Sequence, residues 1–208
     1  DATLTLSLPV GLTATSGLNA IAHAAEGLYA QDINPVMSMF AEEGVRSLAR
    51  GLVSVCERPD DLAAREITQY GAWLCGTVLG NVGMALHHKL CHTLGGTFNL
   101  PHAQTHAVVL PYAMAFNLPS APDAAQRLRR ALDMSDPVAA LFDLGRALGT
   151  PRSLAELGIQ EGDLDRAAEI AMRSPYFNPR ALSQSGIRQV LQMAFEGVRP
   201  TMASFGPP

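Results

Sequence analysis

Apolar residues recur every three to four positions along most of the chain, which is the spacing of amphipathic helices. A first stripe follows Thr15 and Ser16, either of which can cap the start of a helix. Asn34 before a proline predicts the start of a second helix, and Asp60 with Asp61 the start of a third. Together these signals predict an all-α helical bundle.

Only the beginning of the chain departs from this pattern. Thr and Leu alternate over DATLTLSLP, which is typical of a short strand, so we expect a β-like N-terminal segment. No second strand cluster and no alternation of strands with helices follows. We therefore expect residues 1–208 to form a single helical domain.

Glycines punctuate two of the expected helices. Gly76, Gly80 and Gly83 lie in the third helical segment, where their spacing favours close approach of another helix or of a ligand. Gly95 and Gly96 are placed to end a later helix and turn the chain. A further helix is expected where Asp136 precedes a proline.

Composition and charge narrow the function classes. The chain is 48% hydrophobic and 16% charged with a formal net charge of -4, which is typical of a folded globular protein and argues against nucleic-acid binding. The longest apolar window is broken by polar residues and glycines, which argues against a membrane span. Three cysteines without CxxC spacing favour a reducing, cytoplasmic setting.

Histidines are the clearest chemical signal. Five of the six fall in one short window: His87, His88, His92, His102 and His106. His88 and His92 are four residues apart and share a helix face, as do Asn19 and His23 on the first helix. Any one of these histidines is more often a packed or surface residue, but the constellation favours a functional site.

Two segments that contain these residues carry a family resemblance. SGLNAIAHAAEGLYA and GNVGMALHHKLCHTLGGTFNLPHAQTHAVVLPYAMAFN resemble the helical domain of the iron-containing alcohol dehydrogenase superfamily, which has the dehydroquinate synthase-like fold. Within it they are most similar to maleylacetate reductases. The resemblance extends from the start of the chain to NPRALSQSGIRQVLQMAFEGVRP near its end.

The resemblance also implies where a metal would lie. In metal-dependent members a D-x3-H pair and two later histidines hold iron or zinc, and the matching positions here are Asn19, His23, His88 and His102. Asparagine offers a neutral carbonyl oxygen in place of the only anionic ligand. We therefore expect no metal.

The activity implied is reduction of the carbon–carbon double bond of 2-maleylacetate to 3-oxoadipate by NADH or NADPH, in the breakdown of aromatic and chloroaromatic compounds. His92 corresponds to a histidine near the nicotinamide and is the expected proton donor. His23, His88 and His102 are expected to complete the catalytic set and stabilise the developing enolate.

A dicarboxylate substrate needs compensating charge. Lys89 and Arg180 are the candidate anchors, and surface solvation is the alternative for each. Asn19 and His106 are expected beside the substrate, His106 in a supporting position.

The implied partners are the small dicarboxylate, a second copy in a homodimer, and an N-terminal nucleotide-binding domain that these residues lack. This chain alone is therefore expected to be inactive. Two alternatives stay open: a metal-dependent iron or zinc alcohol dehydrogenase, and a non-catalytic helical module whose histidines only pack.

Overall fold

The computed structural model describes residues 1–207, and in that range it contains α-helices and short 3-10 helices but no strand. The α-helices are α1 (Val10–Gly27), α2 (Pro35–Glu57), α3 (Leu62–Leu79), α4 (Leu86–Phe98), α5 (His102–Asn117), α6 (Pro122–Leu132), α7 (Pro137–Ala147), α8 (Leu164–Met172) and α9 (Gln184–Glu196). The 3-10 helices are η1 (Ala2–Thr5), η2 (Leu118–Ser120) and η3 (Glu161–Asp163). The prediction of an all-α fold is confirmed.

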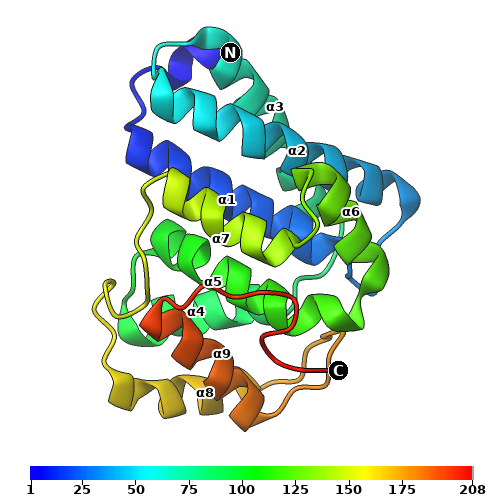
Figure 1. Cartoon of the computed structure of the whole chain (residues 1–208), viewed down its shortest axis with the longest axis vertical. Helices are drawn as coiled ribbons and strands as arrows, with labels where there is room; N and C mark the ends of the chain where they lie inside the picture. Colours follow the sequence, from blue (N-terminus) through cyan, green and yellow to red (C-terminus); the bar gives the residue numbers. More distant parts are fainter. Residues whose placement is uncertain (208) are drawn as a thin grey trace.

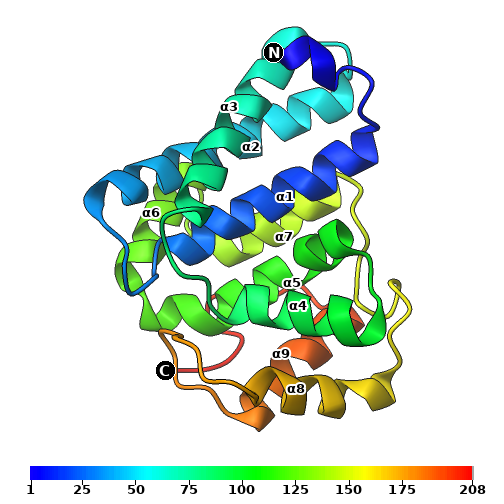
Figure 2. The same cartoon turned by 180° about the vertical axis from the view of Figure 1, so that it is seen from behind.

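The helices form two tiers that meet at α1 and α5. In Figure 1, α2 and α3 lie above α1 near the N-terminus, while α4, α8 and α9 lie below it near the C-terminus. Helix α5 runs through the middle and packs against α1, α4, α7 and α9. Every residue from Thr105 to Asn117 is buried, so α5 is covered on all sides. The view from behind in Figure 2 shows α4 beside α5.

The predicted β-like segment at the N-terminus is wrong, because residues 2–5 form the 3-10 helix η1. The carboxylate of Asp1 accepts hydrogen bonds from the backbone N–H and the hydroxyl of Thr3, and the Thr5 hydroxyl donates to the carbonyl of Ala2. Short polar side chains that satisfy nearby backbone groups favour such turns over an extended strand.

Helix starts were predicted well where a side chain caps them. Asn34, Asp61 and Asp136 each accept hydrogen bonds from backbone N–H groups in the first turn of α2, α3 and α7. Helix α1 instead begins at Val10, several residues before the predicted caps, and has no side-chain cap. Thr15 turns its hydroxyl back to the carbonyl of Gly11, so it lies inside the helix.

Close helix packing uses different glycines from those predicted. A Cβ atom on Gly71 would lie 3.0 Å from the backbone of α2, and one on Gly44 would lie 2.7 Å from Cys75 Sγ, so these glycines let α2 and α3 approach. Nothing lies within 4 Å of such an atom on Gly76. An added Cβ on Gly80 would meet only carbonyls of α3 itself, and one on Gly83 only the Asp32 carboxylate, so the prediction that these three glycines mediate helix packing is wrong.

Helix α4 continues through Gly95 and Gly96 to Phe98, so these glycines do not end it as predicted. The end is Asn99, which has the left-handed conformation with φ 56°. His102 nevertheless returns beside the same helix as the first residue of α5. Among residues 1–207, no helix has the length and apolar character needed to cross a bilayer.

Candidate active site

Histidines from α1, α4 and α5 gather at one place in the fold, with His106 of α5 at the centre. Its ring centroid lies 4.3 Å from that of His102, 5.0 Å from His87 and 5.1 Å from His88. The rings of His23 and His92 are each 6.4 Å from it. The predicted convergence of His23, His88, His92 and His102 is thus present.

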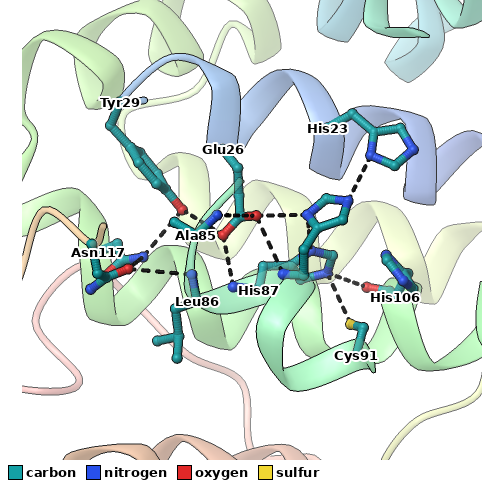
Figure 3. Close-up of polar contacts among 11 residues, drawn as sticks. His23, Glu26, Tyr29, Ala85, Leu86, His87, Cys91, His106 and Asn117 are labelled. Atoms are coloured by element: carbon teal, nitrogen blue, oxygen red, sulfur yellow. Dashed lines mark hydrogen bonds and ion pairs between the residues drawn. The ribbon is translucent and has the colours of Figure 1, made fainter. Parts of the chain in front are cut away.

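A carboxylate that sequence reasoning missed lies beneath this cluster. Glu26 of α1 is fully buried, and its oxygens accept hydrogen bonds from the backbone N–H groups of Ala85 at 3.1 Å, His87 at 2.7 Å and His88 at 3.3 Å (Figure 3). These N–H groups belong to the N-cap residue Ala85, which has no capping side chain of its own, and to the first turn of α4. Glu26 therefore caps α4 from a neighbouring helix, where its charge also suits the helix dipole.

The same carboxylate orients two imidazoles. Glu26 Oε2 lies 2.6 Å from Nδ1 of His88, and Nε2 of His88 lies 2.7 Å from Nδ1 of His23. Since a buried carboxylate needs a donor, the His88 proton belongs on Nδ1 and leaves Nε2 as an acceptor. His23 then donates from Nδ1, which gives a hydrogen-bond chain from Glu26 through His88 to His23.

Burial sets the charge states of the cluster. Burial alone would raise the pKa of Glu26, but the hydrogen bond from His88 and the nearby His87 hold that pKa below its ordinary value. Burial and then the neighbouring His88 lower the pKa of His23 to about 4 and that of His87 to about 3. The pKa of His106 is lowered further by burial and by its imidazole neighbours. His23, His87 and His106 are therefore neutral imidazoles at neutral pH, and Glu26 is an ionised carboxylate beneath them.

The residues that could meet a substrate lie at the edge of the cluster. His92 and His102 are exposed, and burial with the nearby His88 lowers the pKa of His92. Lys89 is half-buried, with its Nζ 5.6 Å from the ring centroid of Tyr176. Asn19 is half-buried on α1, and its Oδ1 is shielded from solvent without a hydrogen-bond partner in the described residues.

Arg180 is engaged elsewhere. Its guanidinium donates to the carbonyls of Phe205 at 2.9 Å and Pro207 at 3.0 Å, and it lies 4.6 Å from the ring centroid of Phe116. These contacts bind the C-terminal segment to the body of the domain. They do not support its predicted role as a carboxylate anchor.

A buried polar chain leads from Glu26 to the segment before α9. Tyr29 donates to Glu26 at 3.4 Å, and Asn117 of α5 donates to the Tyr29 oxygen at 3.2 Å. The side-chain amides of Asn117 and Asn178 exchange hydrogen bonds at 2.9 and 2.7 Å. Asn178 is thereby held against α5 and linked through Asn117 and Tyr29 to Glu26.

A weak signal for Glu26 was present in the sequence. It follows His23 by three residues, so both project from one face of α1, and an acid among alanines on a buried helix needs a partner. His87 carried no separate signal, because one adjacent histidine usually faces away from the site. Here the ring instead packs inward, with Nε2 donating to the carbonyl of His106 at 3.0 Å.

Comparison with known proteins shows which family has this arrangement of helices. Residues 13–195 match the model of the C-terminal part of the Fe-containing alcohol dehydrogenase family. The chain belongs to this family. Its match to the Fe-containing alcohol dehydrogenase family model includes α1, α4 and α5, the three helices that carry the site.

Individual members of the family are similar to this chain in sequence and in structure. A maleylacetate reductase of Pseudomonas sp. (strain P51) is 54% identical over 200 residues, which is 96% of this chain and 57% of that protein. The crystal structure of maleylacetate reductase from Rhizobium sp. strain MTP-10005 superimposes with a TM-score of 0.93 at 55% identity, over 96% of this chain and 57% of that one. The crystal structure of an iron-containing alcohol dehydrogenase from Corynebacterium glutamicum superimposes with a TM-score of 0.89 at 38% identity, over 94% of this chain and 55% of that one. This chain spans little more than half the length of these proteins.

The family implies iron, but the donors at its metal positions do not fit a tight divalent site. His23 Nδ1 and His88 Nε2 are 2.7 Å apart as a hydrogen-bonded pair, whereas two nitrogens on one tetrahedral ion lie about 3.4 Å apart. Asn19 contributes only a neutral oxygen. The one carboxylate nearby, Glu26, is already saturated by donors.

Proposed function

We propose that this chain is the helical part of a maleylacetate reductase, which reduces the double bond of 2-maleylacetate to 3-oxoadipate with NADH or NADPH and without a catalytic metal. The proposal that no metal is needed rests on the geometry of the site. Asn19 stands at the position of an anionic ligand, and the imidazoles of His23 and His88 are hydrogen-bonded to each other. The identity of more than half of all residues to reductases of that name supports the choice of substrate.

The alkene of the substrate is conjugated to a ketone, so hydride addition moves charge onto an enolate oxygen. When bound, the nicotinamide cofactor supplies the hydride. Because His92 is exposed beside the cluster, it can deliver a proton to the adjacent carbon. His102 and Lys89 lie at the same edge and can donate to the enolate and a carboxylate. Glu26 holds His88 in one tautomer, and His88 in turn orients His23.

The cofactor's phosphates would bind outside these residues. A dinucleotide site uses a glycine-rich turn between a strand and a helix, and residues 1–207 contain no strand. We therefore place nucleotide binding in an N-terminal domain of the whole protein. The helical domain would occupy residues 1–208, act in the cytoplasm as part of a homodimer, and have no activity alone.

The decisive experiment follows NADH or NADPH oxidation by the full-length protein with maleylacetate, before and after exhaustive chelation. We expect turnover to be unchanged after chelation. Activity that disappears and returns with iron or zinc would instead assign a metal-dependent alcohol dehydrogenase. If alanine at His88, His92 or His102 changes stability but not turnover, the histidines only pack.

A further inference from the structure

Three side chains of the histidine cluster take no part in the mechanism above. His87 and Cys91 lie one turn apart on α4, and His106 faces them from α5 (Figure 3). All three are at most 1% exposed. Their potential ligand atoms lie within 4.8 Å of one another.

His106 makes this group unusual. Its side chain is fully buried, yet neither ring nitrogen has a hydrogen-bond partner in residues 1–207. A buried polar group without a hydrogen-bond partner destabilises the folded state, so native proteins rarely leave one unpaired. The lone pair of His106 therefore indicates a missing partner between α4 and α5.

The geometry and the donor chemistry suit a metal ion. Cys91 Sγ lies 3.6 Å from His87 Nε2, and a sulfur and a nitrogen on one tetrahedral zinc ion also lie about 3.6 Å apart. With Glu26 saturated and Asn19 neutral, Cys91 is the remaining side chain of the cluster that can supply negative charge. A thiolate with two imidazoles is a donor set that favours soft or borderline cations such as zinc over hard ones.

We infer that His87, Cys91 and His106 form a binding site for a thiophilic d10 cation, Zn²⁺, which links α4 to α5. The site shares no ligand with the four positions that bind metal in the family. Binding requires the Cys91 thiol to lose its proton and His87 to release its hydrogen bond to the His106 carbonyl, so affinity rises with pH. The nearest exposed imidazole is that of His102, whose ring is tilted by 46° against that of His106 at a centroid distance of 4.3 Å.

Cobalt titration of the chelated full-length protein tests the inference, because a thiolate ligand gives Co²⁺ a sulfur-to-metal charge-transfer band that imidazoles alone do not. We expect this band in the wild type and its loss when Zn²⁺ is added. Cys91→Ser should abolish the band. Cys75→Ser is the matched control, since Cys75 is also buried and free but lies on α3, and it should keep the band. His102→Ala should also keep the band, because His102 is not a ligand of the inferred site. If the cobalt instead bound at the family's metal positions, this substitution would weaken its binding.

Thermal unfolding gives a second measurement. At a hundredfold excess of Zn²⁺ over its dissociation constant, the Tm of the wild type should rise by roughly 5 °C, and that of Cys91→Ser should not. Absence of the thiolate band in the wild type overturns the inference whether or not the variants fold. A band that survives Cys91→Ser, or its replacement Cys91→Ala, overturns it as well and leaves water as the partner of His106. Because exhaustive chelation would also remove this ion, the reductase assay is independent of the inference in Cys91→Ser, which lacks the site but keeps every residue of the proposed reaction.

Discussion

His92 and His88 have different surroundings, although they are one helical turn apart. His88 is buried between Glu26 and His23, so hydrogen bonds to both ring nitrogens fix its tautomer and its orientation. His92 is exposed, and no hydrogen bond within residues 1–207 fixes its ring. The buried residue is suited to orienting groups and the exposed one to exchanging a proton with a substrate.

Replacement of His92 by alanine should therefore lower kcat of the full-length protein by about 100-fold or more while KM changes little, since general acid catalysis contributes on that scale. Steady-state kinetics with maleylacetate measure both constants. Added imidazole should restore part of the lost rate, which a purely structural defect would not allow. An unchanged kcat would remove His92 from the proposed mechanism.

Glu26→Gln should lower the free energy of unfolding, because the amide cannot accept from all the donors that now converge on the carboxylate, and each buried donor left unpaired costs about 1–3 kcal/mol. Urea denaturation measures the loss. Glu169→Gln is the control, since Glu169 pairs with Arg173 on the surface, where a change below about 1 kcal/mol is expected. Equal effects of the two substitutions would contradict the assigned role of Glu26.

At the level of the helices, α2 and α3 depend on glycine where their backbones meet. Gly71→Ala should lower the free energy of unfolding by about 1–3 kcal/mol, because its Cβ would meet the backbone oxygen of Gly44 and the nitrogen of Leu48. Gly76→Ala on the same helix meets nothing and should stabilise by up to about 1 kcal/mol. Denaturation of the two variants side by side checks the opposite signs.

Sequence reasoning succeeded for helices with local signals and failed where a distant partner decides. The starts of α2, α3 and α7 could be predicted because each capping residue directly precedes its helix in the sequence. These residues are Asn34, Asp61 and Asp136. The start of α4 has no such residue, since its cap, Glu26, comes from α1. Likewise the spacing of His88, His92 and His102 predicted a cluster, whereas the inward packing of His87 depends on α5.

For the molecule as a whole, buried imidazoles make stability depend on pH. In the metal-free protein the pKa of His87 is about 3, below the ordinary value of 6.5, so the unfolded chain binds the extra proton first as pH falls. Stability should therefore be complete above pH 6.5 and decline below it, by up to about 1.4 kcal/mol per pH unit for His87. The pKa of Glu26 is lowered from its ordinary value of 4.5, so its contribution to stability is complete above pH 4.5 and is lost only as the pH falls below that value.

Urea denaturation at pH 8, 6.5 and 5 measures this decline. The variant His87→Gln should show a smaller difference between pH 6.5 and 5 than the wild type, whatever its stability at pH 8. Identical slopes would mean that His87 is not kept neutral by burial.

The cap that Glu26 provides also bears on how the protein folds. Its contacts with the first turn of α4 join residues 59 to 62 positions apart, so they form only after a long loop has closed. Until α1 arrives, α4 has neither its cap nor an orientation for His88. The cap of α4 and the functional arrangement of the imidazoles would then form in one step, so a molecule in which α1 and α4 have not yet met would hold no half-built active site.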